Sequence, residues 1–212
     1  MYTVVANWVV GLGVSGWVLS LLSGVGVITA EKAGFQTATH ALIAVLVGTG
    51  LGLAGYLIQK PPTRHPTIVL NGFAQVLTVS LAEVMVCWAV VGTVTEAVLQ
   101  ARGFPYPTVV AALVASVVFG IYHIAHSPPF NSIKMIVLLA GIGLVTSLFF
   151  FVSRDIYGTV MFHNFLGMFG VLRALHTSGK LQLYERFKVL LISMALLSIV
   201  LLIVVHVLWV RP

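Results

Sequence analysis

Residues 119–126 read Phe-Gly-Ile-Tyr-His-Ile-Ala-His and place two imidazoles at the end of an otherwise apolar segment. Glu83 lies 40 residues before His123, and His163 lies 40 residues after it, each within another long apolar run. An ionisable side chain in hydrocarbon costs several kcal/mol and is usually functional, with a partner inside the helix bundle. The sequence therefore predicts that Glu83, His123 and His163 share one polar site.

The composition indicates a polytopic membrane protein. The 212 residues are 59% hydrophobic and only 8% charged, and the mean hydropathy is +1.09. A soluble domain of this size does not need so much apolar surface. Backbone amides must be paired in lipid, and the apolar residues come in blocks of about twenty, so the expected fold is an all-α bundle.

Hydropathy and turn residues predict about seven transmembrane helices in a single bundle that covers residues 1–212. Proline and charge separate the second span from the third, and Arg102, Gly103 and the prolines after them separate the third from the fourth. The expected spans are 2–29, 39–59, 68–100, 108–126, 133–152, 156–175 and 189–210.

The net charge of +6 does not indicate nucleic-acid binding, because the eleven basic residues are scattered over short loops. Their distribution instead follows the positive-inside rule, which predicts a cytoplasmic N-terminus. We therefore expect a multi-pass protein of a prokaryotic cytoplasmic membrane. The basic residues on the expected cytoplasmic side are Lys60, Arg64, Lys134, Arg173, Lys180, Arg186 and Lys188, against Lys32, Arg102, Arg154 and Arg211 on the other side.

Helix geometry predicts that Glu83 and His123 meet. Both lie twenty residues from Gly103, the expected turn of a helical hairpin, so both should lie ~30 Å from that turn. His163 lies early in its own span. With an upright fifth span it would be separated in depth from His123 by more than ~10 Å. Convergence therefore requires a strongly tilted fifth span or a recessed turn at Arg154.

Several other polar or aromatic residues are expected at the membrane surface. Glu96 should face water or headgroups, and Arg154 and Asp155 should form a turn pair near the headgroups. His126 should be interfacial or support the site. The four tryptophans, Trp8, Trp17, Trp88 and Trp209, are expected mostly to face lipid or to form interfacial belts.

The chain resembles the membrane-embedded CAAX-type proteases and bacteriocin-processing enzymes, the CPBP or Abi family, over roughly residues 71–175. The family's Phe-x-x-x-His motif reads here as Phe119-Gly-Ile-Tyr-His123. The later histidine motif reads His163-Asn164-Phe-Leu-Gly167, and Glu83 occupies the Glu-Glu-x-x-x-Arg motif. The sequence departs from the family where it has one glutamate, Cys87 or Trp88 for the arginine, and Gly167 for the last asparagine.

The resemblance implies intramembrane peptide hydrolysis, with Glu83 activating water and His123 and His163 completing the site. Asn164 would donate its amide to the oxyanion if its side chain turned inward. Two histidines and one carboxylate also form a reasonable zinc set, so a divalent metal held by His123, His163 and Glu83 is expected. The substrate would be a peptide or a lipidated protein within the bilayer.

Two other functions remain open from the sequence. The missing arginine and second glutamate favour a catalytically inactive member of this fold, acting as a scaffold or as a subunit of a membrane complex. Histidines within the membrane also suit a protein that ligates haem or another tetrapyrrole.

Overall fold

The computed structural model describes residues 3–125 and 130–210, and these residues form helices joined by short loops, with no strand among them. His126 lies outside the described residues, so its expected interfacial or supporting place stays a prediction. The principal helices follow the seven expected spans closely: η1 (Thr3–Val14) with α1 (Ser15–Gly24), α2 (Ala38–Ile58), α3 (Pro66–Glu83) with η2 (Val84–Gly92) and α4 (Thr93–Ala101), α5 (Pro107–Tyr122), α6 (Ile133–Ser153), α7 (Ile156–Thr177), and α8 (Val189–Val205) with η5 (His206–Val210). Two short 3-10 helices, η3 (His123–Ala125) and η4 (Leu181–Tyr184), complete the described elements.

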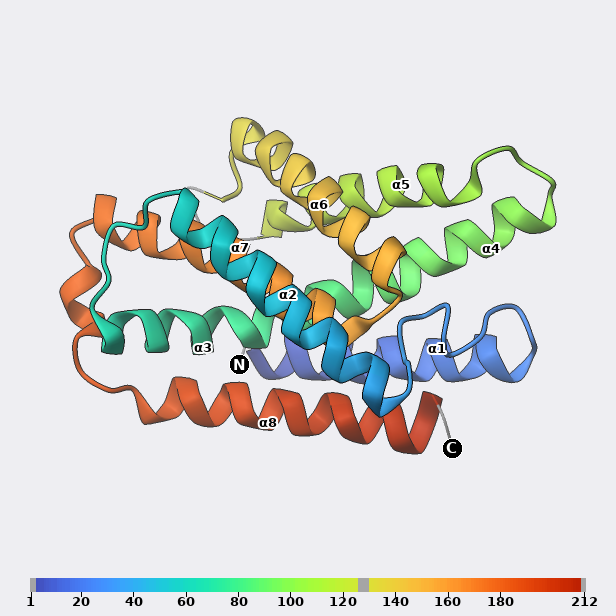
Figure 1. The fold of residues 1–212 in the computed structure, drawn as a ribbon, viewed down its shortest axis with the longest axis horizontal. Coiled ribbons are helices and arrows are strands. Elements are labelled where there is room, and N and C mark those ends of the chain that lie inside the picture. The colour runs from blue at the N-terminus through green and yellow to red at the C-terminus, as the bar shows by residue number, and fades with distance from the viewer. Residues whose placement is uncertain (1–2, 126–129, 211–212) are drawn as a thin grey trace.

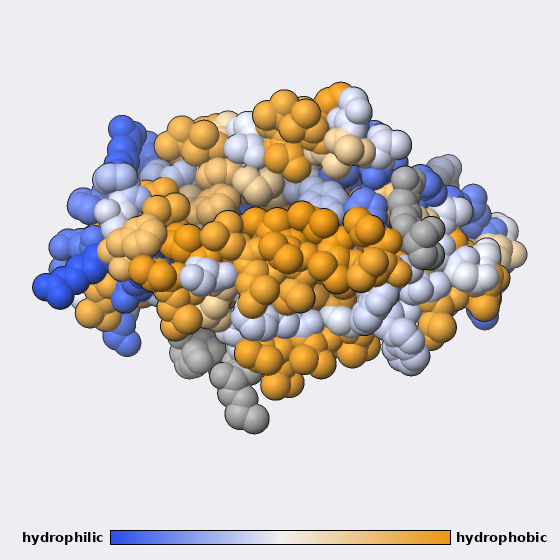
Figure 2. Space-filling view, turned by 90° about the horizontal axis from the view of Figure 1, so that it is seen from below, coloured by the Kyte–Doolittle hydropathy of each residue, from blue (hydrophilic) through white to orange (hydrophobic). Residues whose placement is uncertain are grey.

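The chain is a polytopic helical membrane protein. Five helical segments of the described chain are long and apolar enough to cross a membrane; they are Thr3–Gly24, Ala38–Ile58, Pro66–Ala101, Ile133–Ser153 and Val189–Val210. The apolar helix α5 is shorter, and α7 carries more polar residues. The face that contains α8 is covered by hydrophobic side chains between hydrophilic ends (Figure 2). This surface matches the hydrocarbon core of a bilayer between two headgroup layers.

The long helix formed by α3, η2 and α4 is the centre of the bundle. Proline at its first position suits a helix start, because that residue needs no backbone hydrogen bond there. The helix ends at Ala101, and Gly103 follows with a φ of +66°, a conformation that glycine adopts without strain. Its flanks pack against η1, α5, α7 and α8, so this span is far more buried than the other four (Figure 1).

Glycines allow α2 and α7 to approach closely. A Cβ atom at Gly48 would lie 2.2 Å from the carbonyl oxygen of Gly158, and one at Gly158 would lie 2.6 Å from the backbone of Ala44. Contacts through small residues are a common way for membrane helices to associate, since lipid provides no hydrophobic drive between them. The α2–α7 pair thereby fixes the position of the helix that carries His163.

The fifth span is not upright. Helix α6 crosses the bundle obliquely along α5 (Figure 1), and the turn after it is buried. Asp155 and Ile156 have no exposed surface, and the Ile156 amide donates to the Gly34 carbonyl at 2.8 Å. The structure therefore meets both conditions under which His163 can reach the depth of His123.

The expected surface positions of Glu96 and Asp155 were wrong. Glu96 is buried and forms an ion pair with Arg154, with each guanidinium nitrogen 2.6 Å from one carboxylate oxygen. Asp155 is fully buried and accepts the Gly158 amide at the start of α7. A turn that carries these residues among packed helices must bury them with partners, because an unpaired charge there would be costly.

Trp88 also differs from its expected lipid-facing position. It has no exposed surface, and its indole Nε1 donates to Ser147 Oγ at 2.7 Å. Trp17 and Trp209 do present exposed surface, at 56% and 43%. The reason is that Trp88 lies on the central helix, which packs against η1, α5, α7 and α8.

Candidate active site

Glu83 is the last residue of α3, at the centre of the bundle. It is buried, and its two carboxylate oxygens face two different histidines. Oε1 lies 3.4 Å from His123 Nε2, and Oε2 lies 3.2 Å from His163 Nε2. The structure thus brings together the three ionisable residues that the sequence singled out. A buried carboxylate between two imidazoles is an arrangement suited to general acid–base chemistry.

His123 stands where α5 passes into the 3-10 helix η3. Its Nδ1 lies 2.9 Å from the backbone oxygen of Phe119, one turn earlier on the same helix. The ring of Phe119 packs edge-on against His123, with ring centroids 4.7 Å apart. Phe119 therefore holds His123 through both its backbone and its side chain.

His163 lies in the first half of α7 and is almost fully buried. Its Nδ1 lies 2.9 Å from Thr146 Oγ1 on α6, while its Nε2 faces Glu83. The rings of Trp88 and Phe119 lie 5.2 and 4.9 Å from the imidazole ring. Aromatic rings on one side and a hydroxyl behind the ring leave His163 little freedom to turn.

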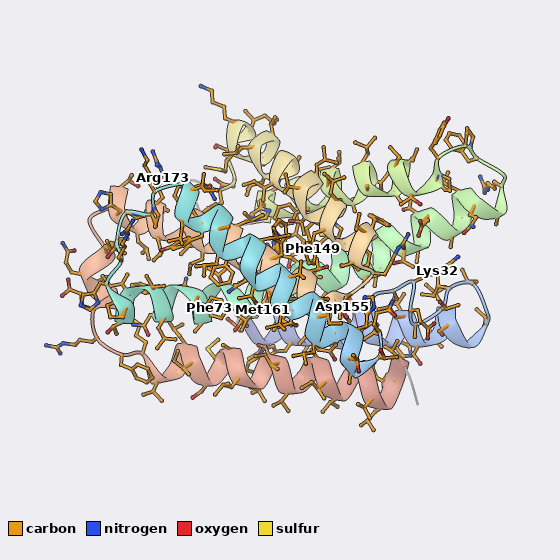
Figure 3. All side chains as sticks on the ribbon, in the orientation of Figure 1. Lys32, Phe73, Phe149, Asp155, Met161 and Arg173 are labelled. Carbon is orange, nitrogen blue, oxygen red and sulfur yellow. The ribbon has the colours of Figure 1, made fainter. Side chains whose placement is uncertain are left out.

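Asn164 does not direct its side chain to Glu83. Its Oδ1 accepts a hydrogen bond from Ser80 Oγ at 3.3 Å, and its Nδ2 donates to the Phe73 carbonyl at 3.3 Å. Both partners belong to α3, and Phe73 and Met161 of α7, which are labelled in Figure 3, pack against the same group of buried residues. The Asn164 amide therefore joins α7 to α3, the two helices that carry His163 and Glu83.

Buried hydroxyl groups support the aromatic wall of the site, which is formed by the rings of Trp88 and Phe119. The sequence did not identify these hydroxyls as part of the site. Ser147 accepts from Trp88, donates to the Ala112 carbonyl at 3.0 Å and lies 2.9 Å from Ser116 Oγ. Serine and threonine within apolar spans often bond across helices, so Ser116, Thr146 and Ser147 carried a usable signal. Their partners were not evident, because the hydropathy pattern does not show which face of a span is buried.

The chemical capacity of the site rests on the free oxygen of Glu83. Oε1 is buried and accepts no hydrogen bond, although His123 Nε2 is nearby. An unpartnered carboxylate oxygen can accept a hydrogen bond from a water molecule. Among residues 3–125 and 130–210, no group of three His, Cys, Asp or Glu side chains has the arrangement of a metal site. Ligation of a metal by His123, His163 and Glu83 stays a prediction.

A separate surface hollow of about 430 Å³ lies at one end of the bundle, between the loop before α3 and the segment after α7. None of the three site residues lines it. It is formed by Pro62, Thr63, His65, Ile68, His176, Gly179, Leu181, Gln182 and Glu185.

A family model of known proteins matches the part of the chain that carries this site. Residues 66–169 match the family model described as type II CAAX prenyl endopeptidase Rce1-like. The chain belongs to the CAAX-protease family through this segment, which covers about half of its length and contains Glu83, His123 and His163. No curated protein and no solved structure matched the chain.

Proposed function

We propose that this protein is an intramembrane endopeptidase whose general base is Glu83. The observation that carries the proposal is the convergence of one buried carboxylate with two imidazoles at 3.4 and 3.2 Å. All three residues lie within the segment that matches the endopeptidase family. The proposed substrate is a peptide or a lipidated protein that reaches the site within the bilayer.

In the proposed reaction, Glu83 Oε1 takes a proton from a water molecule as the water oxygen attacks the scissile carbonyl carbon. The carbon–nitrogen bond then breaks, and the proton held by Glu83 passes to the leaving amine. The water oxygen ends in the new carboxyl group. His123 and His163 orient the carboxylate and supply polar contacts to the attacking water in a site that is otherwise apolar.

Glu83→Gln is the direct test, because it keeps the shape of the side chain and removes the base. We expect the cleavage rate of candidate membrane peptides to fall at least ~100-fold, which is the range that a general base contributes. Glu185→Gln, the same change in an exposed loop, is the matched control and should leave the rate unchanged. Equal activity of wild type and Glu83→Gln would refute the mechanism.

A catalytically inactive role as a scaffold or complex subunit is the second candidate. The observation that favours it is that Asn164 is engaged with α3, while Cys87 and Trp88 stand where the family has its arginine. This candidate predicts that wild type cleaves no peptide and that a membrane partner co-purifies with it. Tetrapyrrole binding is not proposed, because both Nε2 atoms face Glu83. Visible absorption of the purified protein would detect such a group.

Two finer expectations belong to the proposal. Carboxylate and imidazole are suitable zinc donors, but no step above passes through a metal. Loss of activity on dialysis against a chelator, restored by zinc, would support a metal, whereas full retention would exclude it.

The N-terminus is proposed to lie in the cytoplasm of a prokaryotic cell. Labelling of a cysteine introduced at Gly103, with Cys87 replaced by serine, should then occur only from outside.

A further inference from the structure

We propose that Thr146 is a positioning residue that holds His163 in the tautomer with the proton on Nε2. His123 is held in the opposite tautomer, with its proton on Nδ1. The carboxylate of Glu83 thereby has a donor at Oε2 and an acceptor near Oε1. The catalytic consequence rests on the proposed function, whereas the two tautomers follow from hydrogen bonding alone.

The tautomer of His123 follows from its backbone contact. Its Nδ1 lies 2.9 Å from the Phe119 carbonyl oxygen, and a carbonyl oxygen can only accept. His123 Nδ1 must therefore carry a proton. In the neutral ring, Nε2 is then an unprotonated acceptor, and it lies 3.4 Å from Glu83 Oε1. This agrees with the fact that Oε1 receives no hydrogen bond.

His163 has a different partner behind its ring. Its Nε2 is within hydrogen-bond geometry of Glu83 Oε2 at 3.2 Å, and a carboxylate can only accept. A neutral ring that donates from Nε2 needs a donor at Nδ1. The atom there is Thr146 Oγ1 at 2.9 Å, a hydroxyl that can donate.

Among the residues that the structure describes, one other acceptor lies within reach of Thr146, the Ile142 carbonyl one turn earlier on α6. It lies farther away, at 3.2 Å. If Thr146 donated there, His163 would carry its proton on Nδ1. Two acceptors, His163 Nε2 and Glu83 Oε2, would then face each other in a buried site. Leaving buried polar atoms unsatisfied is costly, so the donation to His163 is preferred.

This arrangement gives the two imidazoles different tasks. His163 binds and orients Oε2 of the carboxylate, and it cannot accept a proton on Nε2. His123 leaves Oε1 unpartnered and can accept a hydrogen bond from the same water that Glu83 deprotonates. A threonine hydroxyl suits the place behind His163, because it can donate, whereas the carbonyl behind His123 cannot.

The tautomers can be read from nitrogen-15 NMR of histidine-labelled protein in lipid bilayers, treated with a chelator, at neutral pH. Signals of His123 and His163 are assigned by their loss in His123→Gln and His163→Gln. We expect the Nε2–H tautomer for His163 and the Nδ1–H tautomer for His123. The Nδ1–H tautomer at His163, or an imidazolium there, would overturn the assignment.

Three variants then test the part played by Thr146. Thr146→Val removes the hydroxyl and keeps the shape, so the Nδ1–H tautomer should gain population at His163. Thr146→Ser should restore the wild-type spectrum. Thr159→Val, at a buried threonine whose hydroxyl donates to the Asp155 carbonyl, is the matched control. An unchanged His163 spectrum in Thr146→Val would refute the positioning role.

The activity readout separates this inference from the proposed function. If wild type cleaves peptides, Thr146→Val should lower kcat about tenfold or more, with KM nearly unchanged and with recovery in Thr146→Ser. Recovery by serine would not follow from a packing role alone. If wild type cleaves nothing but shows the expected tautomers, the endopeptidase proposal fails and the assignment of Thr146 stands.

Discussion

Arg154 donates two hydrogen bonds to the carboxylate of Glu96, each 2.6 Å long, although the residues lie 58 positions apart. Thr108 also donates to the same carboxylate, so the pair joins α4 and α5 to the turn between α6 and α7. A bidentate arginine–carboxylate pair is strong and geometrically specific. It holds the turn in its recessed position, and the depth of His163 depends on that turn.

We therefore predict that Arg154→Met destabilises the protein by about 2–3 kcal/mol, below the figure for a fully buried pair because Arg154 is partly exposed. The loss arises mainly from the Glu96 charge left without its partner. Unfolding in mixed micelles measures it. The double variant Arg154→Met with Glu96→Gln should recover much of the stability, and Arg102→Met at an exposed position is the control. Additive losses in the double variant would contradict this account.

A second prediction concerns two glycines on one helix. Gly48→Ala should destabilise the fold by about 1–3 kcal/mol, because the new Cβ would meet the Gly158 carbonyl oxygen at 2.2 Å. Gly50→Ala places its Cβ in open space and should be neutral or slightly stabilising, since alanine favours a helix. Thermal unfolding of both variants decides the matter, and equal stabilities would show that the α2–α7 contact is not tight.

The buried carboxyl of Asp155 predicts a dependence of stability on pH. Burial raises the pKa of Asp155 above its ordinary value of 3.8, although the Gly158 amide and His40 act in the opposite direction. The folded protein then keeps a proton that the unfolded chain has already lost. The contribution of this group to the free energy of unfolding therefore falls as pH rises from about 3.8 through the raised pKa, and is constant above it.

Asp155→Asn isolates this contribution, because asparagine can still accept the Gly158 amide at the start of α7. We expect wild type to lose stability relative to Asp155→Asn as pH rises through that window. The measurement is the difference in unfolding free energy between the two proteins at several pH values. If the unfolding free energy of wild type instead rose relative to that of Asp155→Asn with rising pH, the folded protein would stabilise the carboxylate, contrary to this prediction.

A fourth prediction concerns the hydroxyl beneath Trp88. Ser147→Ala removes the acceptor of the buried indole N–H and should cost about 1–3 kcal/mol. It should also loosen the aromatic wall beside His163. Ser178→Ala, at an exposed position, is the control and should change stability little. Wild-type stability in Ser147→Ala would mean that the Trp88 indole finds another acceptor.

The helix boundaries were predictable from local chemistry. Gly103 follows the end of a helix at the expected turn, whereas Pro66 and Pro107 begin helices one or two residues before the expected spans. The meeting of Glu83 and His123 was also predictable, because their equal spacing from a short turn fixes their relative depth.

The remaining contacts depend on tilt and rotation, which a uniformly apolar sequence does not encode. The oblique course of α6 could not be read from its hydropathy, and the pairing of Arg154 with Glu96 follows from that course. The buried position of Trp88 was not evident from the sequence, because the residues of η2 are apolar on every face of the helix. The side chain of Asn164 lies toward α3, where it forms hydrogen bonds with Ser80 and the Phe73 carbonyl.

Glu83 is followed directly by the π-helical stretch η2, which leads to Glu96 on α4. A π-helical turn holds more residues than an α-helical turn, so the phase between these two acids depends on the length of that stretch. Removal of one residue from it would change the direction in which Glu96 points around the helix axis relative to Glu83. Sequences that preserve both acids should therefore tolerate many substitutions between them but no insertion or deletion.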